Sequence, residues 1–243
     1  MSFLLALRFL SILPIPGGAQ ATERQLGRST AWYPLVGLIF GVLLFGWVYA
    51  LTRVLSALPA AFLCLAAWVV ITGALHLDGL ADSFDGLGAG DRAKRLAVMK
   101  DSRTGVFGVA ALVLVLIGKF ALLSELIGVY RIRGVILVPV LGRWSMLLTI
   151  FLFPTAGMGL ASRVKKDCRL PQLLVGTLVT VAAAWILVGI RALPALAVAA
   201  ATSAGMGWLF RAKVGGCTGD CYGAVCELSE VLSLLMLTVL THR

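Results

Sequence analysis

Three aspartates follow an apolar run in the first half of the chain, within the segment HLDGLADSFDGLGA at residues 76–89. Asp78, Asp82 and Asp85 are spaced i, i+4 and i+7, and a helix of about 3.6 residues per turn places that spacing on one face. No basic residue lies among them, so their charges repel one another unless a cation binds between them. The pattern predicts a divalent-metal site at these three aspartates. The alternative is a solvated helix face paired with the bases of residues 92–95.

A second polar motif, MKDSRTGVFG, covers residues 99–108 and opens the next apolar run. Its base–acid–base triplet suits a phosphate, because Lys100 and Arg103 supply positive charge and Gly105 lets the backbone approach closely. The N-terminus of the following helix would direct its N–H groups at the same anion. We expect Lys100, Arg103 and Gly105 to bind phosphate, and Asp101 to be a metal ligand or a general base. The alternative is a basic anchor at the membrane surface with a capping aspartate.

A third motif, GGCTGDCYGA, covers residues 215–224 and precedes two glutamates. It lacks the Lys-Ser/Thr that ends a Walker A loop, so taken alone it is typical of a turn between helices. Its polar residues fall on the same side of the membrane as the aspartate segment. Asp220 and Glu227 are therefore further candidates for a metal ligand or a base.

Two basic residues stand inside apolar runs, where an ionised side chain is costly and generally marks a function or a pairing partner. Arg143 lies in PVLGRWSM and Lys119 in LIGKFALL. We expect Arg143 to contribute to phosphate binding, and Lys119 to pair with Glu125 or to extend toward the interface. The five cysteines and two histidines have the wrong spacing for a four-ligand zinc site.

The composition indicates an integral membrane protein, because 60% of the 243 residues are hydrophobic and 13% are charged. We expect one all-α domain over residues 1–243, a polytopic helix bundle whose partner is the lipid bilayer and not a nucleic acid. About 20 apolar residues cross a bilayer, which predicts about seven transmembrane helices. They are Trp32–Val54, Pro59–Leu77, Gly105–Gly128, Ile132–Phe153, Pro171–Ile190, Ala192–Phe210 and Ala224–Leu240. The stretch Ser2–Pro14 is too short to span and predicts an interfacial helix.

The distribution of charge predicts the orientation, because Lys and Arg concentrate in cytoplasmic loops. With the N-terminus in the cytoplasm, most of the 21 basic residues fall on cytoplasmic segments. All acidic residues except Glu125 lie on or near the same segments. We therefore expect a protein of the cytoplasmic membrane, the inner membrane in a cell that has two, with its active site facing the cytoplasm.

The three polar motifs resemble those of the cobalamin synthase family, also called adenosylcobinamide-GDP ribazoletransferases. The resemblance covers HLDGLADSFDG, MKDSRTGVFG and GGCTGDCYGAVCELSE, with RFLSILPIP near the start and WYPLVGLIFG at the first span, in the same order over essentially the whole chain. It implies a Mg²⁺-dependent transferase that joins α-ribazole, or its 5′-phosphate, to adenosylcobinamide-GDP and releases GMP. It also implies small-molecule substrates, and homo-oligomers or contacts with other corrinoid-pathway enzymes are open possibilities.

For this chemistry the acids and bases divide into roles. Asp78, Asp82, Asp85 and Glu227 are expected to hold Mg²⁺, and Asp82, Asp101 and Asp220 are the catalytic candidates. Two other classes remain as alternatives. DGLADSFDG partly resembles the metal motif of CDP-alcohol phosphotransferases but lacks the Ala-Arg and the downstream Gly/Asp repeat. An ion-coupled transporter would place acids at mid-membrane in repeated halves.

Overall fold

The computed structural model describes residues 2–15, 21–128, 133–157 and 159–240, and within these ranges the chain is helical. The described residues contain no strand, and one isolated bridge joins Thr155 to Cys217. The all-α expectation is confirmed. The helices are α1 (Ser2–Leu10), α2 (Glu23–Ser29), α3 (Tyr33–Leu51), α4 (Ala57–Thr72), α5 (Leu75–Gly88), α6 (Arg92–Val98), α7 (Val106–Gly128), α8 (Arg133–Leu152), α9 (Leu160–Lys166), α10 (Leu170–Val188), α11 (Ala192–Val214) and α12 (Gly219–Val239), with two short 3₁₀ turns at Thr30–Trp32 and Gly189–Arg191.

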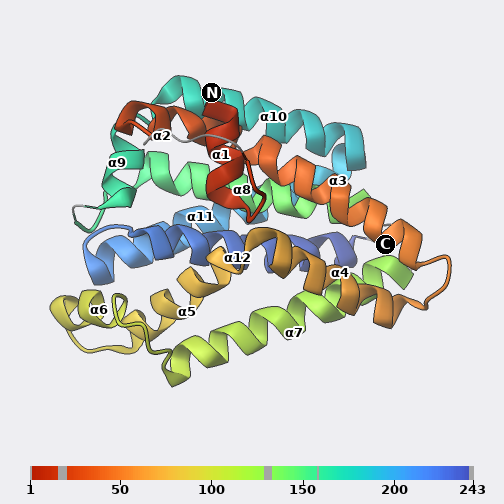
Figure 1. The fold of residues 1–243 in the computed structure, drawn as a ribbon, viewed down its shortest axis with the longest axis horizontal. Coiled ribbons are helices and arrows are strands. Elements are labelled where there is room, and N and C mark those ends of the chain that lie inside the picture. The colour runs from red at the N-terminus through yellow and green to blue at the C-terminus, as the bar shows by residue number, and fades with distance from the viewer. Residues whose placement is uncertain (1, 16–20, 129–132, 158, 241–243) are drawn as a thin grey trace.

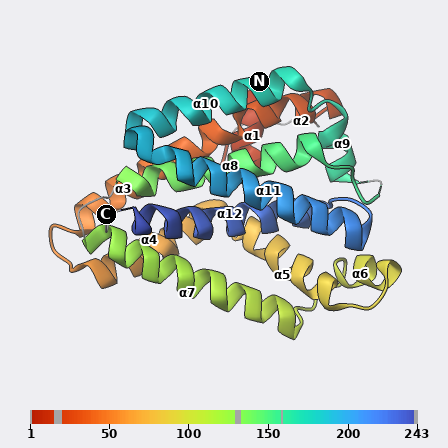
Figure 2. The ribbon, with the colours of Figure 1, turned by 180° about the vertical axis from the view of Figure 1, so that it is seen from behind.

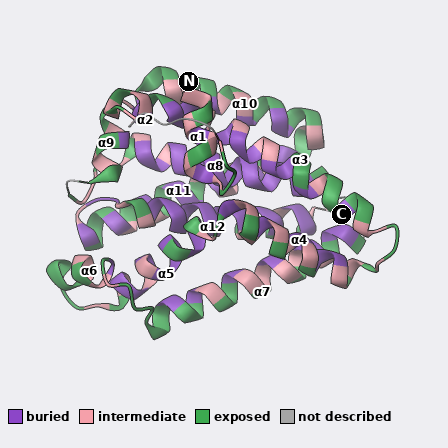
Figure 3. Cartoon of the chain, viewed as in Figure 1, coloured by how far each residue is buried: buried purple, intermediate pink, exposed green. Residues whose placement is uncertain are grey.

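The long helices run roughly along the longest axis of the molecule and surround two central ones, α8 and α12 (Figures 1 and 2). α8 packs against α3, α10, α11 and α12, and α12 packs against α5, α7, α8 and α11. Most side chains of α8 and α12 are buried, whereas α7 and α10 expose an apolar face (Figure 3). Helices that are apolar on the outside suit a surrounding bilayer.

Glycines let α3 and α8 approach closely. A Cβ at Gly37 would lie 2.3 Å from the carbonyl oxygen of Pro139, and one at Gly41 would lie 2.2 Å from that of Ile136. Gly37 and Gly41 are four residues apart, so both lie on the face of α3 that meets α8. Small residues at such an interface bring the two backbones into contact.

The second predicted span is broken, because α4 ends at Thr72 and α5 leaves it at an angle of 86°. Gly73 and Ala74 both have left-handed backbone conformations, with φ of 60° and 55°. Two successive left-handed residues end a helix and redirect the chain. The predicted segment Pro59–Leu77 is therefore too long by five residues, and the aspartates lie on a separate helix that runs toward one end of the bundle.

Five helical segments are long and apolar enough to cross a membrane, or six if the bent pair α4 and α5 counts as one span. The number seven is not confirmed, because α10 and α11 form one apolar helical segment, Leu170–Val214, by this measure. The predicted interfacial segment Ser2–Pro14 contains α1, which ends at Leu10. Phe9 of α1 stacks on Tyr33, with ring centroids 6.3 Å apart.

Basic residues gather at one end of the bundle, where Figure 1 shows α2, α6 and α9. These helices carry Arg24, Arg28, Arg92, Lys94, Arg95, Arg163, Lys165 and Lys166. The opposite end, with the α3–α4 connection and the turn between α10 and α11, carries Arg53 and Arg191. The predicted cytoplasmic segments therefore share one end of the molecule.

Candidate active site

The aspartate helix α5 packs directly on the first turns of α12. A Cβ at Gly79 would lie 2.8 Å from the carbonyl oxygen of Asp220, and a Cβ at Gly223 would lie 3.1 Å from that of His76. Side chains larger than hydrogen at these two positions would force the helices apart. The glycines of the first and third motifs thus bring Asp220 against α5.

This packing gathers four carboxylates. The negative charges of Asp78, Asp220 and Asp85 all act on Asp82, and that of Asp78 also acts on Asp220. Asp78 is exposed, whereas Asp82 and Asp220 are partly buried. The third motif, expected on the same side as the aspartate segment, thus lies against it, and a cation bound here would relieve the mutual repulsion.

Two adjoining cavities open beside these carboxylates. The first, which we call the inner pocket, has a volume of about 180 Å³ and is lined by Asp78 and Asp220 among mostly apolar and aromatic residues. The second, the lysine pocket, has a volume of about 380 Å³ and is lined by Lys100 and Asp220. Both share Gly219, Asp220 and the first two residues of α9, Leu160 and Ala161. Asp220 therefore stands in the wall between them.

The segment before α12 is clamped to the chain that leaves α8. The Cys217 N–H donates to the carbonyl of Pro154 at 2.8 Å, and the Ala156 N–H donates to that of Cys217 at 3.0 Å. Gly216 has a φ of 152°, and a Cβ there would lie 2.5 Å from the backbone of Thr155. Glycine is thus needed at Gly216. The clamp fixes the start of α12, which presents Asp220 to both pockets.

Thr218 caps α12 and also contacts the candidate base. Its hydroxyl oxygen accepts from the Cys221 N–H at 3.3 Å, and its hydroxyl donates to Asp220 Oδ2 at 3.1 Å. A threonine at this position is a preferred helix N-cap. The cap holds the Asp220 carboxylate in a defined orientation at the shared wall.

Asp85 is held away from the two pockets. Its Oδ2 accepts from the Gly105 N–H at 2.6 Å and its Oδ1 accepts from the Gly108 N–H at 2.8 Å, and the side chain is buried. A Cβ at Gly105 or Gly108 would lie within 2.5 Å of the carboxylate oxygens. The anion at the N-terminus of α7 is therefore Asp85 itself. This corrects two expectations, because the Gly105 N–H is taken by Asp85 rather than offered to phosphate, and Asp85 has a structural partner where a metal was expected.

Asp101 and Arg103 contact each other in the exposed α6–α7 connection. Arg103 Nη2 donates to Asp101 Oδ2 at 2.7 Å and Arg103 Nε donates to Oδ1 at 3.1 Å. Through these bonds Arg103 lowers the pKa of Asp101 to about 2. A carboxylate with so low a pKa is a weak proton acceptor, so Asp101 is poorly suited to be a general base. Lys100, one residue earlier, is exposed and lines the lysine pocket.

A buried charge cluster joins four helices behind the inner pocket. Lys119 Nζ of α7 donates to Glu227 Oε2 at 2.6 Å and also contacts Glu230, both on α12. Arg143 of α8 pairs with Glu230, and its Nη2 lies 3.3 Å from Nδ1 of His76 on α5. All five residues are at most 4% exposed.

This cluster corrects three expectations. Lys119 pairs with Glu227 and Glu230, which are far along the chain, rather than with Glu125. Glu227 is engaged by Lys119 and so is not an open metal ligand. Arg143 is fully buried, and its guanidinium contacts His76, which lines the inner pocket. Arg143 therefore influences the pocket through His76 and is not placed to bind a phosphate itself.

No three His, Cys, Asp or Glu side chains in the described parts of the chain are arranged to hold a metal by themselves. The charges of Asp78 and Asp220 nevertheless act on Asp82, so these three carboxylates lie near one another. Mg²⁺ commonly binds through one or two carboxylates together with substrate phosphates, so a preformed protein cage is not required.

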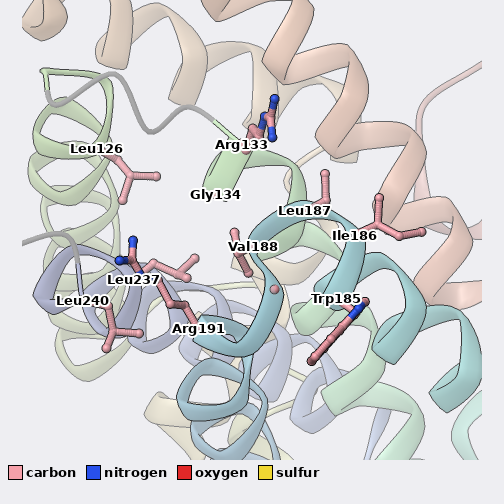
Figure 4. Close-up of a pocket in the computed structure, with 11 residues that line it drawn as sticks. Leu126, Arg133, Gly134, Trp185, Ile186, Leu187, Val188, Arg191, Leu237 and Leu240 are labelled. Carbon is pink, nitrogen blue, oxygen red and sulfur yellow. The ribbon is translucent and has the colours of Figure 1, made fainter.

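A further cavity, of about 680 Å³, lies at the other end of the bundle and differs in its lining. Figure 4 shows its lining of Leu126, Ile186, Val188, Leu237 and other apolar residues, with Arg133 and Arg191. None of the described residues that line it is acidic. The candidate carboxylates Asp78 and Asp220 line the pockets near α9 instead.

His76 and Tyr222 were not among the site residues expected from the sequence, although both line the inner pocket. His76 lies two residues before Asp78, and Tyr222 lies two residues after Asp220. On a helix, residues two apart point in different directions, so this proximity in sequence does not predict a shared pocket. Only the packing of α5 on α12 brings them together.

Comparisons with known proteins cover nearly the whole chain. The profile of a family described as Cobalamin-5-phosphate synthase matches residues 2–238. An adenosylcobinamide-GDP ribazoletransferase of Pseudomonas fluorescens is 43% identical over 242 residues, which cover 97% of this chain and 98% of the relative. Proteins of the same name from Geotalea daltonii and Brevibacillus brevis are 40% and 37% identical, over 99% and 97% of this chain and 98% and 97% of their own lengths. No solved structure matches the chain.

Proposed function

The chain belongs to the family of cobalamin-5-phosphate synthases, and we propose that it joins α-ribazole, or its 5′-phosphate, to adenosylcobinamide-GDP with release of GMP. The relatives that carry the name of this transferase cover the full length of the chain, so the alternatives of a CDP-alcohol phosphotransferase and of an ion-coupled transporter are not favoured.

One observation carries the proposal: two adjoining pockets share Asp220 as a wall. A transfer between two substrates needs two adjacent subsites with a proton acceptor between them. The lysine pocket offers a cation for phosphate oxygens, and the inner pocket offers an apolar surface for the acceptor. Asp78 and Asp220 lie where the two substrates would meet.

In the proposed reaction a ribose hydroxyl of the acceptor attacks the phosphorus on the cobinamide side of the diphosphate. A new P–O bond forms, the bond to the GMP oxygen breaks, and the hydroxyl proton moves to a base. Asp220 is the best-supported base, because Thr218 orients its carboxylate at the shared wall. Asp101 is less suited, because it lies in the exposed α6–α7 connection and is not among the lining residues of either pocket.

Positive groups near the diphosphate stabilise the charge that develops during transfer. Lys100 lines the pocket that would hold it. Arg103 is exposed in the same connection and donates to Asp101. We propose that Lys100 contacts the phosphates directly and that Arg103 joins it when the diphosphate competes with Asp101.

The residues fit a magnesium ion, because Asp78, Asp82 and Asp220 supply hard oxygen donors whose mutual repulsion a cation would relieve. We propose that Asp78 and Asp82 would hold Mg²⁺ together with the diphosphate, which leaves Asp220 to accept the hydroxyl proton. When bound, the ion would neutralise charge on the phosphoryl oxygens. Asp85 is excluded from this set by its bonds to Gly105 and Gly108.

We place the site at the cytoplasmic face of the cell's inner membrane. The clustering of basic residues at the end with α2, α6 and α9 supports this orientation, because such residues stay on the cytoplasmic side. The apolar outer faces of α7 and α10 support contact with lipid.

The test is release of GMP. The purified protein in nanodiscs, given adenosylcobinamide-GDP, α-ribazole and Mg²⁺, should release GMP in step with formation of adenosylcobalamin, and omission of α-ribazole or of divalent metal should stop it. Gly46→Ala is a matched control, because a Cβ at Gly46 meets nothing within 4 Å. Absence of GMP release under every metal and acceptor condition would remove the proposal.

A further inference from the structure

Two residues that line the inner pocket carry a buried polar atom that lacks a partner. His76 Nε2 and the Tyr222 hydroxyl have no hydrogen-bond partner among the described residues, and the two residues are 2% and 5% exposed. A buried polar group without a partner is destabilising, so one that lines a cavity is a candidate to bond to a ligand. Two such groups in one cavity point to a ligand that bonds to them.

The remaining lining describes the ligand's shape and polarity. Phe9, Tyr33, Met146, Ile150 and Val164 line the pocket, so its walls are apolar and partly aromatic. Its volume of about 180 Å³ lies below the roughly 300–1,000 Å³ of pockets for whole drug-sized ligands. It can therefore take one compact apolar group, but neither a corrin nor a guanosine diphosphate.

The buried charge cluster determines which hydrogen-bonding group His76 presents. Arg143 Nη2 lies 3.3 Å from His76 Nδ1, and a guanidinium only donates, so Nδ1 is the acceptor. The ring hydrogen of neutral His76 is then on Nε2. The pocket thus offers an N–H donor from His76 and a hydroxyl from Tyr222, and its ligand must carry an acceptor atom.

We propose that the inner pocket is the acceptor subsite, which receives the benzimidazole of α-ribazole with the unsubstituted ring nitrogen bonded to His76 Nε2–H. This inference rests on the proposed function and deepens it. A planar bicyclic base with one acceptor nitrogen matches the apolar walls and the His76 donor, and the Tyr222 hydroxyl would bond to a ribose oxygen. The ribose would then lie at the mouth beside Asp78 and Asp220, facing the diphosphate in the lysine pocket.

Direct binding tests the subsite without turnover. Calorimetry on the full-length protein in nanodiscs, without metal or adenosylcobinamide-GDP, should show binding of α-ribazole. Tyr222→Phe should weaken it by roughly two- to tenfold, the scale of one hydrogen bond. Removing the hydroxyl breaks no bond within the described protein, so this variant should keep the wild-type melting temperature. Tyr49→Phe, an exposed residue near the α3–α4 end, is the matched control and should bind as the wild type does.

A substrate analogue tests the bond to His76. The riboside of indole keeps the bicyclic shape and lacks the acceptor nitrogen, so the wild type should bind it roughly two- to tenfold more weakly than α-ribazole. His76→Leu should bind the two ligands equally, whereas His76→Gln, which retains an N–H donor, should restore part of the preference.

The binding and turnover results distinguish a failure of the proposed acceptor subsite from a failure of the proposed function. Equal α-ribazole affinity in wild type and Tyr222→Phe, no binding by the wild type, or no preference over the indole riboside would overturn the acceptor subsite even if GMP is released. Ribazole binding that depends on Tyr222, in a protein that never releases GMP, would uphold the subsite and remove the proposed function.

Discussion

Asp82 stands among three other carboxylates, and their charges oppose its own. Replacement by asparagine keeps the shape and removes one charge. If Asp82 holds Mg²⁺ at the diphosphate, we expect Asp82→Asn to lower kcat by at least about 100-fold, the scale of losing a metal or oxyanion contact. Folding should be unaffected, because the change relieves repulsion. Near-normal turnover at ordinary Mg²⁺ concentration would exclude the metal role.

Asp85 lies one helical turn further along α5, and the same substitution there should lower the stability of the protein, which Asp82→Asn should not. Its carboxylate accepts two N–H groups at the start of α7, and an amide nitrogen cannot accept. We expect Asp85→Asn to lower the free energy of unfolding by about 0.5–2 kcal/mol, as for loss of a helix cap. Thermal unfolding in detergent, with Asp82→Asn as the isosteric control, measures this. An unchanged melting temperature would contradict the capping role.

The sequence predicts which aspartates share a helix but not what each one contacts. The spacing of Asp78, Asp82 and Asp85 indicates one face, and all three lie on α5. The hydrogen-bond partners of Asp85 are the N–H groups of Gly105 and Gly108, which are 20 and 23 residues further along the chain. The path of the α6–α7 connection brings them to Asp85, and the sequence around Asp85 does not predict that path. Arg143 and Glu227 differ from expectation for the same reason, because their partners come from other helices.

Between elements, the glycines of α3 determine how closely it approaches α8. We expect Gly41→Ala to destabilise the protein by about 1–3 kcal/mol, because its Cβ would collide with the backbone of Ile136. Gly46→Ala on the same helix has open space and is the control. Melting temperatures of the two variants in one detergent test the difference. Equal melting temperatures of the two variants would mean that α3 and α8 can move apart without loss of stability, which would contradict the prediction.

Helix positions were predictable from apolar runs, whereas the break between α4 and α5 was not. Gly73 and Ala74 adopt left-handed conformations within a continuous apolar stretch, and alanine is otherwise a strong helix former. Local propensity therefore predicts an unbroken helix over these residues. The packing of α5 on α12 supports the bend and overrides that preference.

For the whole molecule, the clustering of basic residues predicts an orientation that labelling can test. In a background without the five native cysteines, single cysteines near Arg53 and Arg191 should react with a membrane-impermeant reagent from the periplasm. Cysteines near Gly88, Lys165 and Gly219 should react only after the membrane is opened. The reverse pattern would place the carboxylates on the side without nucleotides.

The charge cluster of Lys119, Arg143, Glu227 and Glu230 has a consequence for biogenesis. During synthesis α7 and α8 leave the ribosome with one cation of the cluster each, Lys119 and Arg143, before α12 supplies the two glutamates that pair with them. Unpaired cations are costly in hydrocarbon, so these early helices are poorly retained in lipid until the last helix arrives. A chain that stops before Gly219 would leave both cations without these counter-ions. We therefore expect stable packing of α7 and α8 to depend on the arrival of α12.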